Sequence, residues 1–592
     1  MESSPSVARD YWSNAVRPRL AFLDSFVGSQ RALKHISTDP RRVLDIELAA
    51  LDAAASHIRF RQNALSPVGS LPPEILAAVF QLYVSQFRFA EATEAISRRS
   101  TAPRKMLHNS HIAWVASLTH VCRHWRSVAL NCRTLWQTVD FSMDPQWWRE
   151  MIIRSNPAPL ILAMSEKHLR EADILIAHLH RIEELDLVHC SSIQTIVDLC
   201  IPSPNLRALS VSASNGEGEY VSLSEALFPG DTPKLRKVIL RYCFFPWTSS
   251  LFKNLAYLEI TFGNVWHPSL ASILFDELGP FVQFLDAISA MPTLETLILK
   301  NCLFFNSTDV ETDHPIISLP SLTKFEFSGS VTHCVALLAH LEISSCIMFS
   351  VALHDRDETG NHGDAVLSYL SAAILRVQNM GKIIRSIVVE YANSVLLTKA
   401  YEERVEGDPR AFGGDPVIQI YIDDLAMPED EAVEEDLVQK TLGLFPLDAV
   451  TNLCFTGNIF YKDEWAWLFD DATQLSSIFA MNAAAESLIP ALNHTIPLPA
   501  GPTTSADATV LYRPVFPHLR TLWLESANLA DCGLESIDEL GVELLHSLQA
   551  RRGIVDTLIL RDCKLSLAAE RALLRAEHFR LDIQPSSGQI LE

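Results

Sequence analysis

The feature that most constrains this chain is a short apolar template that returns along it after residue 180. Its first copy, Ile182, Leu185, Leu187 and Cys190, has the form I-x-x-L-x-L-x-x-C. Similar copies start at Leu235, Leu294 and Val555, and at Val450 with Asn458 in the last place. Weaker copies without the terminal Cys or Asn start at Leu206, Leu255, Leu322, Ile384 and Leu519. Each L-x-L pair is predicted to be a short strand whose alternate side chains enter a core.

The end of the template predicts a second inward position. A small polar side chain there can satisfy backbone groups between stacked turns. We therefore interpret the four terminal cysteines as buried structural residues, in preference to nucleophiles or metal ligands. They are Cys190, Cys243, Cys302 and Cys563.

The whole pattern is that of leucine-rich repeats, in which each turn buries its apolar face against its neighbours. We expect an α/β fold with an irregular solenoid over residues 143–592, parallel strands on the concave face and helices or loops outside. The steps are uneven, and the two longest gaps follow Leu322 and Ile384. SCIMFSVALH and DPVIQIYID are the strands predicted inside those gaps.

Several segments around the repeats carry predictions of their own. Residues 365–377 and 434–444 are predicted to be outer helices, and residues 567–579 a capping helix before a disordered tail from Gln584. Residues 138–164 read as two strands around a turn rich in Trp. Residues 484–514, rich in Ala, Pro, Thr and Ser, are predicted to be a flexible insert.

Upstream of the repeats, residues 71–136 have the pattern of three short helices. Pro72, Pro73 and Glu74 suit a first helical turn, where a missing N–H and a negative charge are tolerated. Apolar residues at helical spacing follow: Ile75, Leu76, Val79, Phe80, Tyr83, and later Val115, Leu118, Val121, Cys122, Trp125 and Val128. Leu135 and Trp136 close a third segment. So few residues cannot bury a core alone, so their remaining apolar side chains must meet the rest of the chain or a partner.

This stretch closely resembles an F-box, in the form seen in fungal proteins of the mushroom (basidiomycete) type. The matching elements, in order, are Leu71-Pro72-Pro73-Glu74-Ile75-Leu76, Val121-Cys122-Arg123-His124-Trp125-Arg126 and Leu135-Trp136. The one departure is a polar insert at residues 87–113. The resemblance implies an F-box domain over residues 66–142 that docks on a Skp1-type adaptor of a cullin ubiquitin ligase. The adaptor-binding residues it implies are Leu71, Pro72, Pro73, Glu74, Ile75, Leu76, Val79, Phe80, Val121, Cys122, Trp125, Leu135 and Trp136.

If the F-box holds a ligase, the solenoid is expected to hold a protein target. The outward x positions of the L-x-L strands form the predicted target-binding face. These positions are Glu184, Asp186, Lys237, Thr296, Trp523 and Thr557, with Ile239, Ile298 and Ile559 beside them. Trp523 is the first to test, because exposed Trp side chains often anchor interfaces.

Residues 1–65 precede the F-box as a tail and a helix. From Arg41 to Leu65, an apolar stripe lies between polar residues. The stripe fits a short coiled coil or dimer seam, or a helix packed against the F-box or an adjacent domain. We favour packing, because the stripe is shorter than four heptads.

Composition narrows the class of protein. The net charge of −23 opposes nucleic-acid binding, which needs Lys and Arg facing phosphates. Eleven cysteines without a C-x-x-C pair favour a reducing compartment. The start MESSPSVARDYWSNAV does not have the pattern of a secretory signal, and no apolar run is long enough to span a bilayer. We expect a cytoplasmic or nuclear protein.

No constellation of residues in the sequence predicts catalysis. Phosphate-loop, H-E-x-x-H and G-x-S-x-G motifs are absent. The segment HDRDETGNHGD, from His354, fits either a metal site or a polar loop tip, and we favour the loop. His120 and His124 have the i, i+4 spacing of a two-His ligand pair on the predicted helix, without a third ligand. We expect neither a metal nor a cofactor.

Two functions remain open. The first is a substrate receptor of an SCF-type ligase, which raises the local concentration of a target and needs no catalytic residue of its own. The second is a scaffold outside any ligase, in which the F-box-like helices cap the repeats. Exposure of Leu71, Pro72, Ile75, Leu76 and Trp125 favours the first, and burial on the repeats favours the second.

Overall fold

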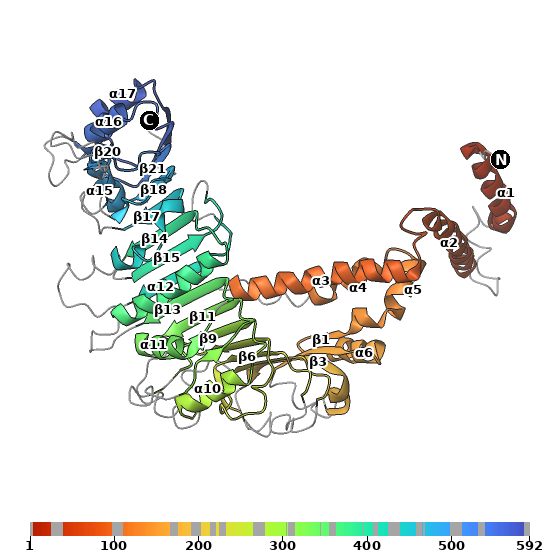
Figure 1. Cartoon of the computed structure of the whole chain (residues 1–592). Helices are drawn as coiled ribbons and strands as arrows, with labels where there is room; N and C mark the ends of the chain where they lie inside the picture. The colour runs from red at the N-terminus through yellow and green to blue at the C-terminus, as the bar shows by residue number, and fades with distance from the viewer. Residues whose placement is uncertain are drawn as a thin grey trace, which may run out of the picture. The chain divides into compact units, whose positions relative to one another are not determined.

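A computed structural model of the chain divides into two compact units. The first contains residues 1–139 and 143–159, and the second residues 140–142 and 160–592 (Figure 1). The residues described are 4–24, 40–97, 110–165, 176–190, 203–213, 221–223, 232–263, 279–303, 305, 314–343, 345–354, 363–392, 395–405, 412–423, 439–457, 465, 468–497, 512–530 and 539–584.

The first unit is helical. Its elements are α1 (Pro5–Asp24), α2 (Pro40–Ala64), α3 (Pro73–Ser97), α4 (Ser110–Thr119), α5 (Arg123–Asn131), the 3₁₀ helix η2 (Arg133–Trp136) and α6 (Pro145–Ser155). The helices predicted between residues 71 and 136 are present, but α3 continues to Ser97, into the predicted insert. The side chains of α3 beyond Ser85 lie outside the described residues, as do residues 98–109.

A small aromatic core joins α3 to α4, α5 and η2, each of which packs against α3. The Phe80 and Trp125 rings lie 5.0 Å apart, and the Trp114 and Trp136 rings 5.2 Å apart, between ring centroids. The indole N–H of Trp136 donates to the carbonyl of Ala129 at 2.9 Å. Two helical turns and one 3₁₀ turn are thereby held around one Trp side chain, which is how so short a stretch keeps a defined shape.

The Trp-rich turn predicted near residue 147 is wrong, because these residues form helix α6. Asp144 caps its N-terminus by accepting a hydrogen bond from the Gln146 N–H at 2.8 Å, and Pro145 occupies the first turn. Trp148 is buried while Trp147 is exposed, as expected for consecutive residues of an amphipathic helix. The two strands predicted on either side of the turn are present as β1 (Thr138–Asp140) and β2 (Leu160–Ser165).

The second unit is a mixed α/β structure built on a large, mostly parallel sheet. The seventeen strands of this sheet are β1 (Thr138–Asp140), β2 (Leu160–Ser165), β3 (Ile182–Cys190), β4 (Ala208–Ala213), β6 (Lys237–Arg241), β8 (Tyr257–Thr261), β9 (Thr296–Lys300), β11 (Lys324–Gly329), β13 (Met348–His354), β14 (Ser386–Ala392), β15 (Val395–Tyr401), β16 (Ile418–Asp423), β17 (Asn452–Thr456), β18 (Ser477–Met481), β21 (Thr521–Glu525), β22 (Thr557–Arg561) and β23 (Arg580–Gln584). Small two-stranded sheets pair β5 (Val221–Ser222) with β7 (Cys243–Phe244), β10 (Ile317–Ser318) with β12 (Leu341–Glu342), and β19 (Thr495–Pro497) with β20 (Tyr512–Pro514).

The repeat template predicts the strands well. Every copy after the first has its strand two residues beyond its first anchor, as Leu235 precedes β6 and Val555 precedes β22. The two strands predicted in the long gaps are β13 and β16. From β2 to β13 the strands pair in parallel and in chain order, and they do so again from β17 to β23.

The expectation of parallel strands throughout is wrong in the middle of the sheet. There, β16 pairs with β13, β14 pairs with β17, and β15 lies between β14 and β16, antiparallel to both. Only two residues separate β14 from β15, which suits a hairpin and not the long crossover that a parallel pair needs. The sequence step between Ile384 and Val450 is long because it contains two further strands, β15 and β16.

A left-handed residue ends the strand in several turns of the sheet. Tyr242, Asn301, Asn482, Ser526 and Asp562 each follow the last residue of a strand, with φ between 51° and 57°. Each donates its N–H to the next strand of the sheet or to the residue at its end, as Asn301 does to the Ser328 carbonyl at 2.7 Å. Asn, Asp and Ser are suited to this bend, because their side chains can replace a local backbone hydrogen bond.

The residue after this bend is the inward position predicted for the template cysteines. Cys243 and Cys302 are buried, and the Cys243 thiol lies 3.3 Å from the Val211 carbonyl. Cys563 is half-buried, with its thiol 3.4 Å from the Leu524 carbonyl. Burial raises the pKa of the Cys302 and Cys563 thiols, so both stay neutral and unreactive. The side chain of Cys190, like residue Asn458, lies outside the described residues.

Helices follow one another along one side of the sheet (Figure 1). They are α10 (Phe281–Ser289), α11 (Val331–His340), α12 (Gly363–Asn379), α15 (Ala483–Leu492), α16 (Leu540–Ala550) and α17 (Leu567–Leu574), with 3₁₀ helices η4 (Leu179–Arg181) and η7 (Leu447–Ala449). The predicted helix at residues 365–377 is α12. The predicted capping helix is α17, but it ends at Leu574 because the chain then enters β23, a strand that the template did not predict.

The flexible insert predicted at residues 484–514 is wrong where the structure describes it. Residues 483–492 form α15, whose residues Ala484, Leu488 and Ile489 are buried, and β19 and β20 pair behind it. A run of Ala is a good helix former, and Pro490 near its end did not prevent the helix. Residues 498–511 lie outside the described part, as do residues 434–438 of the predicted helix at 434–444 and residues 585–592 of the predicted tail.

Candidate functional site

The first candidate surface lies on helix α3, which has two apolar faces. Leu76 and Phe80 are fully buried on the face that packs against α4, α5 and η2. Ile75 and Val79 lie on the other face, with 52% and 45% of their surface exposed. Leu82, which the sequence analysis did not single out, continues that second face with 70% exposure. The three exposed residues, at i, i+4 and i+7, are called the α3 stripe below.

The leader of α3 is also accessible. Pro72, Pro73 and Glu74 are exposed, and Leu71 is half-buried. The first turn of the helix is formed by a hydrogen bond in which the Leu76 N–H donates to the Pro72 carbonyl at 3.0 Å. The proline ring at Pro73 fixes the backbone of the first turn and removes a donor that would otherwise be unpaired. The α3 stripe is therefore presented on a helix whose start is rigid.

The junction between α4 and α5 adds one more exposed apolar residue. Val121 is 55% exposed in the turn between the two helices. Cys122 caps α5, because its sulfur accepts a hydrogen bond from the Trp125 N–H at 3.4 Å. Trp125 is half-buried against Phe80. Cys122 and Trp125 thus shape the turn that holds Val121 at the surface.

The other residues of the predicted adaptor-binding set are internal. Leu135 and Trp136 are each 2% exposed, and Trp136 is enclosed by Trp114 and the Ala129 carbonyl. Like Leu76 and Phe80, they support the surface and are not part of it. Exposure of five side chains was expected to distinguish a ligase receptor from a cap on the repeats, and the five differ in exposure. Pro72 and Ile75 are exposed, Leu71 and Trp125 are half-buried, and Leu76 is buried within the first unit.

The predicted two-His ligand pair is wrong. Helix α4 ends at Thr119 and α5 begins at Arg123, so His120 and His124 do not share a helical face. His354, from the other candidate site, contacts Ser328 at 3.0 Å and Asp423 at 3.6 Å, while residues 355–362 lie outside the described residues. Within the described part of the chain, no cluster of His, Cys, Asp and Glu could hold a metal ion.

The second candidate surface is the face of the sheet that carries the outward x positions. Strand pairing places Glu184, Ala208, Lys237, Tyr257 and Thr296 in one row. The next row, called the central row, crosses the whole sheet from β2 to β23. It consists of Ala163, Asp186, Ser210, Ile239, Glu259, Ile298, Glu326, Ser350, Gln419, Lys399, Val388, Cys454, Phe479, Trp523, Ile559 and Asp582.

Strand pairing places the six predicted target-binding residues in these two rows or their continuation. Glu184 and Lys237 are exposed, and Asp186, Thr296, Trp523 and Thr557 are half-buried. Asp186 and Trp523 occupy the central row, and Thr557 pairs with Thr521 and Arg580 at the far end. The side chains that contact them come from neighbouring strands, as Ser210 of β4 does for Asp186 and Phe479 of β18 for Trp523. An L-x-L pattern alone does not mark these contacts, but aligning the copies by their anchors would have found them.

Between β8 and β11 the central row carries two carboxylates, Glu259 and Glu326, one on each side of the buried Ile298. Glu259 accepts hydrogen bonds from the Tyr257 hydroxyl at 2.7 Å and from the Arg241 guanidinium at 2.8 Å. Glu326 lies 2.6 Å from the Lys300 ammonium and 3.8 Å from that of Lys324. The carboxylates are thus buried deeper than the cations, whose side chains are 38–45% exposed. This half of the face presents cations to solvent on an acidic protein.

The electrostatics of the two acidic residues differ. Burial raises the pKa of Asp186, in spite of a hydrogen bond with Ser210. Burial also acts to raise the pKa of Glu259, but hydrogen bonds from Tyr257 and Arg241 and the charges of Arg241 and Lys300 outweigh it and leave that pKa lowered. Glu259 is therefore a carboxylate fixed in its charged form by the neighbouring cations.

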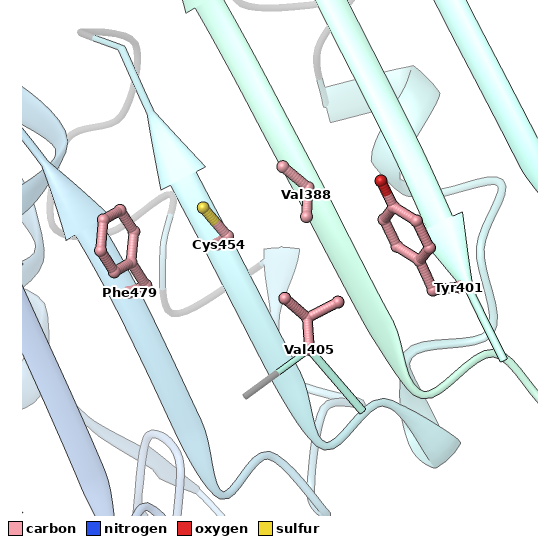
Figure 2. Close-up of a cluster of buried hydrophobic side chains, with 5 residues drawn as sticks. All are labelled: Val388, Tyr401, Val405, Cys454 and Phe479. Carbon is pink, nitrogen blue, oxygen red and sulfur yellow. The ribbon is translucent and has the colours of Figure 1, made fainter. Parts of the chain in front are cut away.

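The central row is apolar between β14 and β21. Val388, Cys454 and Phe479 are buried beside Tyr401 and Val405, and Figure 2 shows these five side chains gathered on one face of adjacent strands. Phe412, Met481 and Trp523 pack against this cluster. Val405 and Phe412 belong to the residues between β15 and β16, here called the covering segment (402–405 and 412). The Phe412 ring lies 5.2 Å from that of Tyr401.

Two polar side chains hold the covering segment. The Ser386 hydroxyl donates to the Glu403 carbonyl and accepts from the Val405 N–H, both at 2.8 Å. The Asn452 amide donates to the Val405 carbonyl at 3.2 Å. Trp523 then packs on Phe479 at 5.1 Å, and its indole N–H is buried without a hydrogen-bond partner in the described residues. Trp523 is half-buried at the margin of this cluster.

Comparison with known proteins adds no assignment. No known protein-family model matches the chain, and no curated protein is detectably similar to it. The helices within the described residues include none that is both long and apolar enough to span a bilayer.

Proposed function

We propose that the chain is a substrate-receptor subunit of an SCF-type cullin-RING ubiquitin ligase. In this proposal the first unit docks on a Skp1-type adaptor, which connects it to the cullin ligase core, and the second unit binds a protein target. The proteins that the sequence resembles work in the cytoplasm or the nucleus, where we place this one. The chain contributes no catalytic residue and no cofactor, because a receptor acts by holding its target near the transferred ubiquitin.

The α3 stripe carries the adaptor half of this proposal. Ile75, Val79 and Leu82 follow directly on the Leu-Pro-Pro-Glu leader that resembles an F-box, and about half or more of each side chain's surface is exposed. A helix at the surface of a folded unit normally turns such apolar residues toward the core of that unit. Here α3 already buries Leu76 and Phe80 on its other face, so the stripe is surplus to the fold of the unit. A groove-forming partner would bury it.

The sheet face carries the target half. We propose that the stacked strands and the helices along their one side form an irregular leucine-rich-repeat solenoid, with the central row on its concave face. The target would contact Glu184, Asp186, Lys237, Thr296, Trp523 and Thr557 and the cations between β6 and β11. Charges at such a face select partners and speed their encounter more than they add affinity. The target itself is a protein of unknown identity.

The test is direct binding of the purified full chain to a purified Skp1-type adaptor by calorimetry. The test variant is Ile75→Asp, Val79→Asp, Leu82→Asp. Burial of each of these side chains is worth about 1.5–3 kcal/mol, so we expect affinity to fall by at least about 100-fold. Because all three are exposed, circular dichroism and the melting temperature should be unchanged.

The matched control is Ile153→Asp on α6, since Ile153 is 69% exposed in the same unit and outside the α3 stripe. It should bind like wild type. Equal binding by the triple variant would contradict the assignment of the stripe. If wild type itself fails to bind, the alternative takes precedence, in which the chain is a scaffold outside any ligase and the F-box-like helices cap the repeats.

A further inference from the structure

Helix α2 leaves an apolar stripe uncovered. Its apolar residues Leu44, Leu48, Leu51, Ala55 and Ile58 follow one another at alternating steps of four and three residues, which is the a/d spacing of a coiled coil. The polar Gln62 and Leu65, which lies just past the end of the helix, continue the spacing. Leu48, Leu51, Ile58 and Leu65 are 59%, 39%, 53% and 87% exposed. No described side chain of α2 is fully buried, although Val43, Leu44, Ala54 and Ala55 are half-buried.

The other contacts of α2 do not explain the stripe. Its described link to α1 is an ion pair, in which the Arg19 guanidinium donates to both carboxylate oxygens of Glu47 at 2.6–2.9 Å. Ile46 and Phe60 are also exposed, but they lie fourteen residues apart on the opposite side and form no stripe. Single exposed apolar residues are ordinary, whereas exposed apolar residues in one a/d line along a helix form a surface that a second helix can cover.

We propose that α2 is a self-association helix, which pairs with α2 of a second copy of this chain in an antiparallel coiled coil. The choice of a second copy rests on the charge distribution along the helix. Beside the seam, the first half of α2 has Asp45, Glu47 and Asp52, and the second half has Arg59 and Arg61. Opposite charges therefore meet only when the two helices run in opposite directions.

The register follows from the heptad. With Leu48, Ala55 and Gln62 at a and Leu44, Leu51, Ile58 and Leu65 at d, an antiparallel pair sets Leu48 opposite Ile58 of the second copy. The e positions of the two helices then face each other, so Asp45 meets Arg59 twice by symmetry. The g positions place Arg61 on the side of Glu47, whose carboxylate is already paired with Arg19, so the pairing of the helices rests on Asp45 and Arg59. One like-charge pair remains, Asp52 with its own copy at the crossing point.

A parallel pair fits the charges less well. There e positions face g positions, so Asp52 would face Glu47 of the second copy, whose charge is already paired with Arg19. Asp45 and Arg59 would not meet at all. Like charges facing each other across such a seam are destabilising, and they discriminate against a wrong pairing.

The first experiment measures the mass of the full chain by light scattering and sedimentation over a concentration series. We expect twice the mass of one chain at high concentration. Leu51→Asp, Ile58→Asp should give a monomer. The control, Ala50→Asp, His57→Asp, places the same substitutions one residue earlier on an exposed face of α2 and should remain a dimer. Wild type that stays monomeric up to about 0.1 mM would overturn the proposal.

The second experiment tests the direction of the helices. Asp45→Arg alone sets Arg against Arg59 of the second copy, and Arg59→Asp alone sets two Asp residues opposite each other. Each variant should dimerise about tenfold more weakly than wild type. An equimolar mixture of the two variants restores both opposite-charge pairs, so the heterodimer should regain the wild-type affinity. A mixture no tighter than the separate variants would overturn the antiparallel pairing.

This inference does not depend on the proposed function. The α2 seam and the α3 stripe are different surfaces, and the assay contains no adaptor. A chain that dimerises without binding an adaptor, or binds an adaptor as a monomer, would separate the two proposals.

Discussion

The two halves of the central row have the same backbone pattern and opposite chemistry. Between β8 and β11 the row carries Glu259 and Glu326, each held by cations from neighbouring strands. Between β14 and β21 it carries Val388, Cys454 and Phe479, and the covering segment lies over them. In both halves the L-x-L positions of neighbouring strands lie opposite each other, and the inward residues are apolar.

This difference separates two tasks within one repeat. The inward residues of L-x-L decide that a strand forms and where it pairs, because they fill the core beneath the helices. The outward residue is under no such constraint, and its chemistry determines whether that part of the face is available. In the apolar half the chain covers its own face, which makes a second small core. In the polar half the exposed cations remain available to a partner.

The largest expected effect comes from removing a ring from the apolar half. Phe479 is 5% exposed and contacts Trp523, so Phe479→Ala leaves a cavity between β17, β21 and the covering segment. We expect a loss of about 3 kcal/mol in stability, the usual cost of a buried Phe→Ala change. Hydrogen exchange of the β17 and β18 amides measures this loss locally.

The matched control lies in the same row on the polar half. Glu326→Ala removes a side chain that is partly exposed and paired with Lys300, and such pairs contribute less than about 1 kcal/mol. Amides of β9 and β11 should exchange almost as in wild type. If Phe479→Ala costs no more than Glu326→Ala, the apolar half is not a core and the contrast between the halves fails.

A smaller effect is expected when the covering segment is released. Ser386→Ala deletes the hydroxyl that bonds both Glu403 and Val405, so the buried Val405 N–H and the part-buried Glu403 carbonyl lose their partner. We expect a local loss of about 1–2 kcal/mol. Faster exchange should be confined to the covering segment, and Trp523 fluorescence should shift to the red as water reaches the cluster. Ser350→Ala, at a half-buried serine of the central row, is the comparison, and it should leave both signals unchanged.

The sequence predicted the strands because their determinants are local. An anchor and an L-x-L pair lie within six residues, so one reading locates a strand such as β6 or β22. The α3 leader was predictable for the same reason, since Pro73 and Glu74 act on the first turn of their own helix. What could not be predicted depends on residues far apart. β13 pairs with β16 although β14 and β15 lie between them in the chain, and β14 pairs with β17 beyond β15 and β16.

Arg551 is a second example of a contact without a local signal. Its guanidinium is buried and donates to the carbonyls of Leu492, Val515 and Phe516, and burial lowers its pKa to about 10. An Arg after a helix gives no indication that it will bind the end of helix α15 and the turn at residues 515–516. The exposed half of the candidate site was equally hidden, because only the packing of α3 reveals which apolar face is left over.

The smallest predicted effect concerns the polar half and depends on pH. The pKa of Glu259 is lowered in the folded chain, so its charged form is favoured by folding. A carboxyl with a lowered pKa stabilises the fold above its ordinary pKa of about 4.5, and that contribution disappears as the pH falls through the folded value. Glu259→Gln, which keeps the shape of the side chain without its charge, should therefore have a slightly lower free energy of unfolding than wild type at pH 7. The difference should be less than about 1 kcal/mol and should vanish toward pH 3. A difference that persists in acid would mean that the charge of Glu259 is not what stabilises this part of the row.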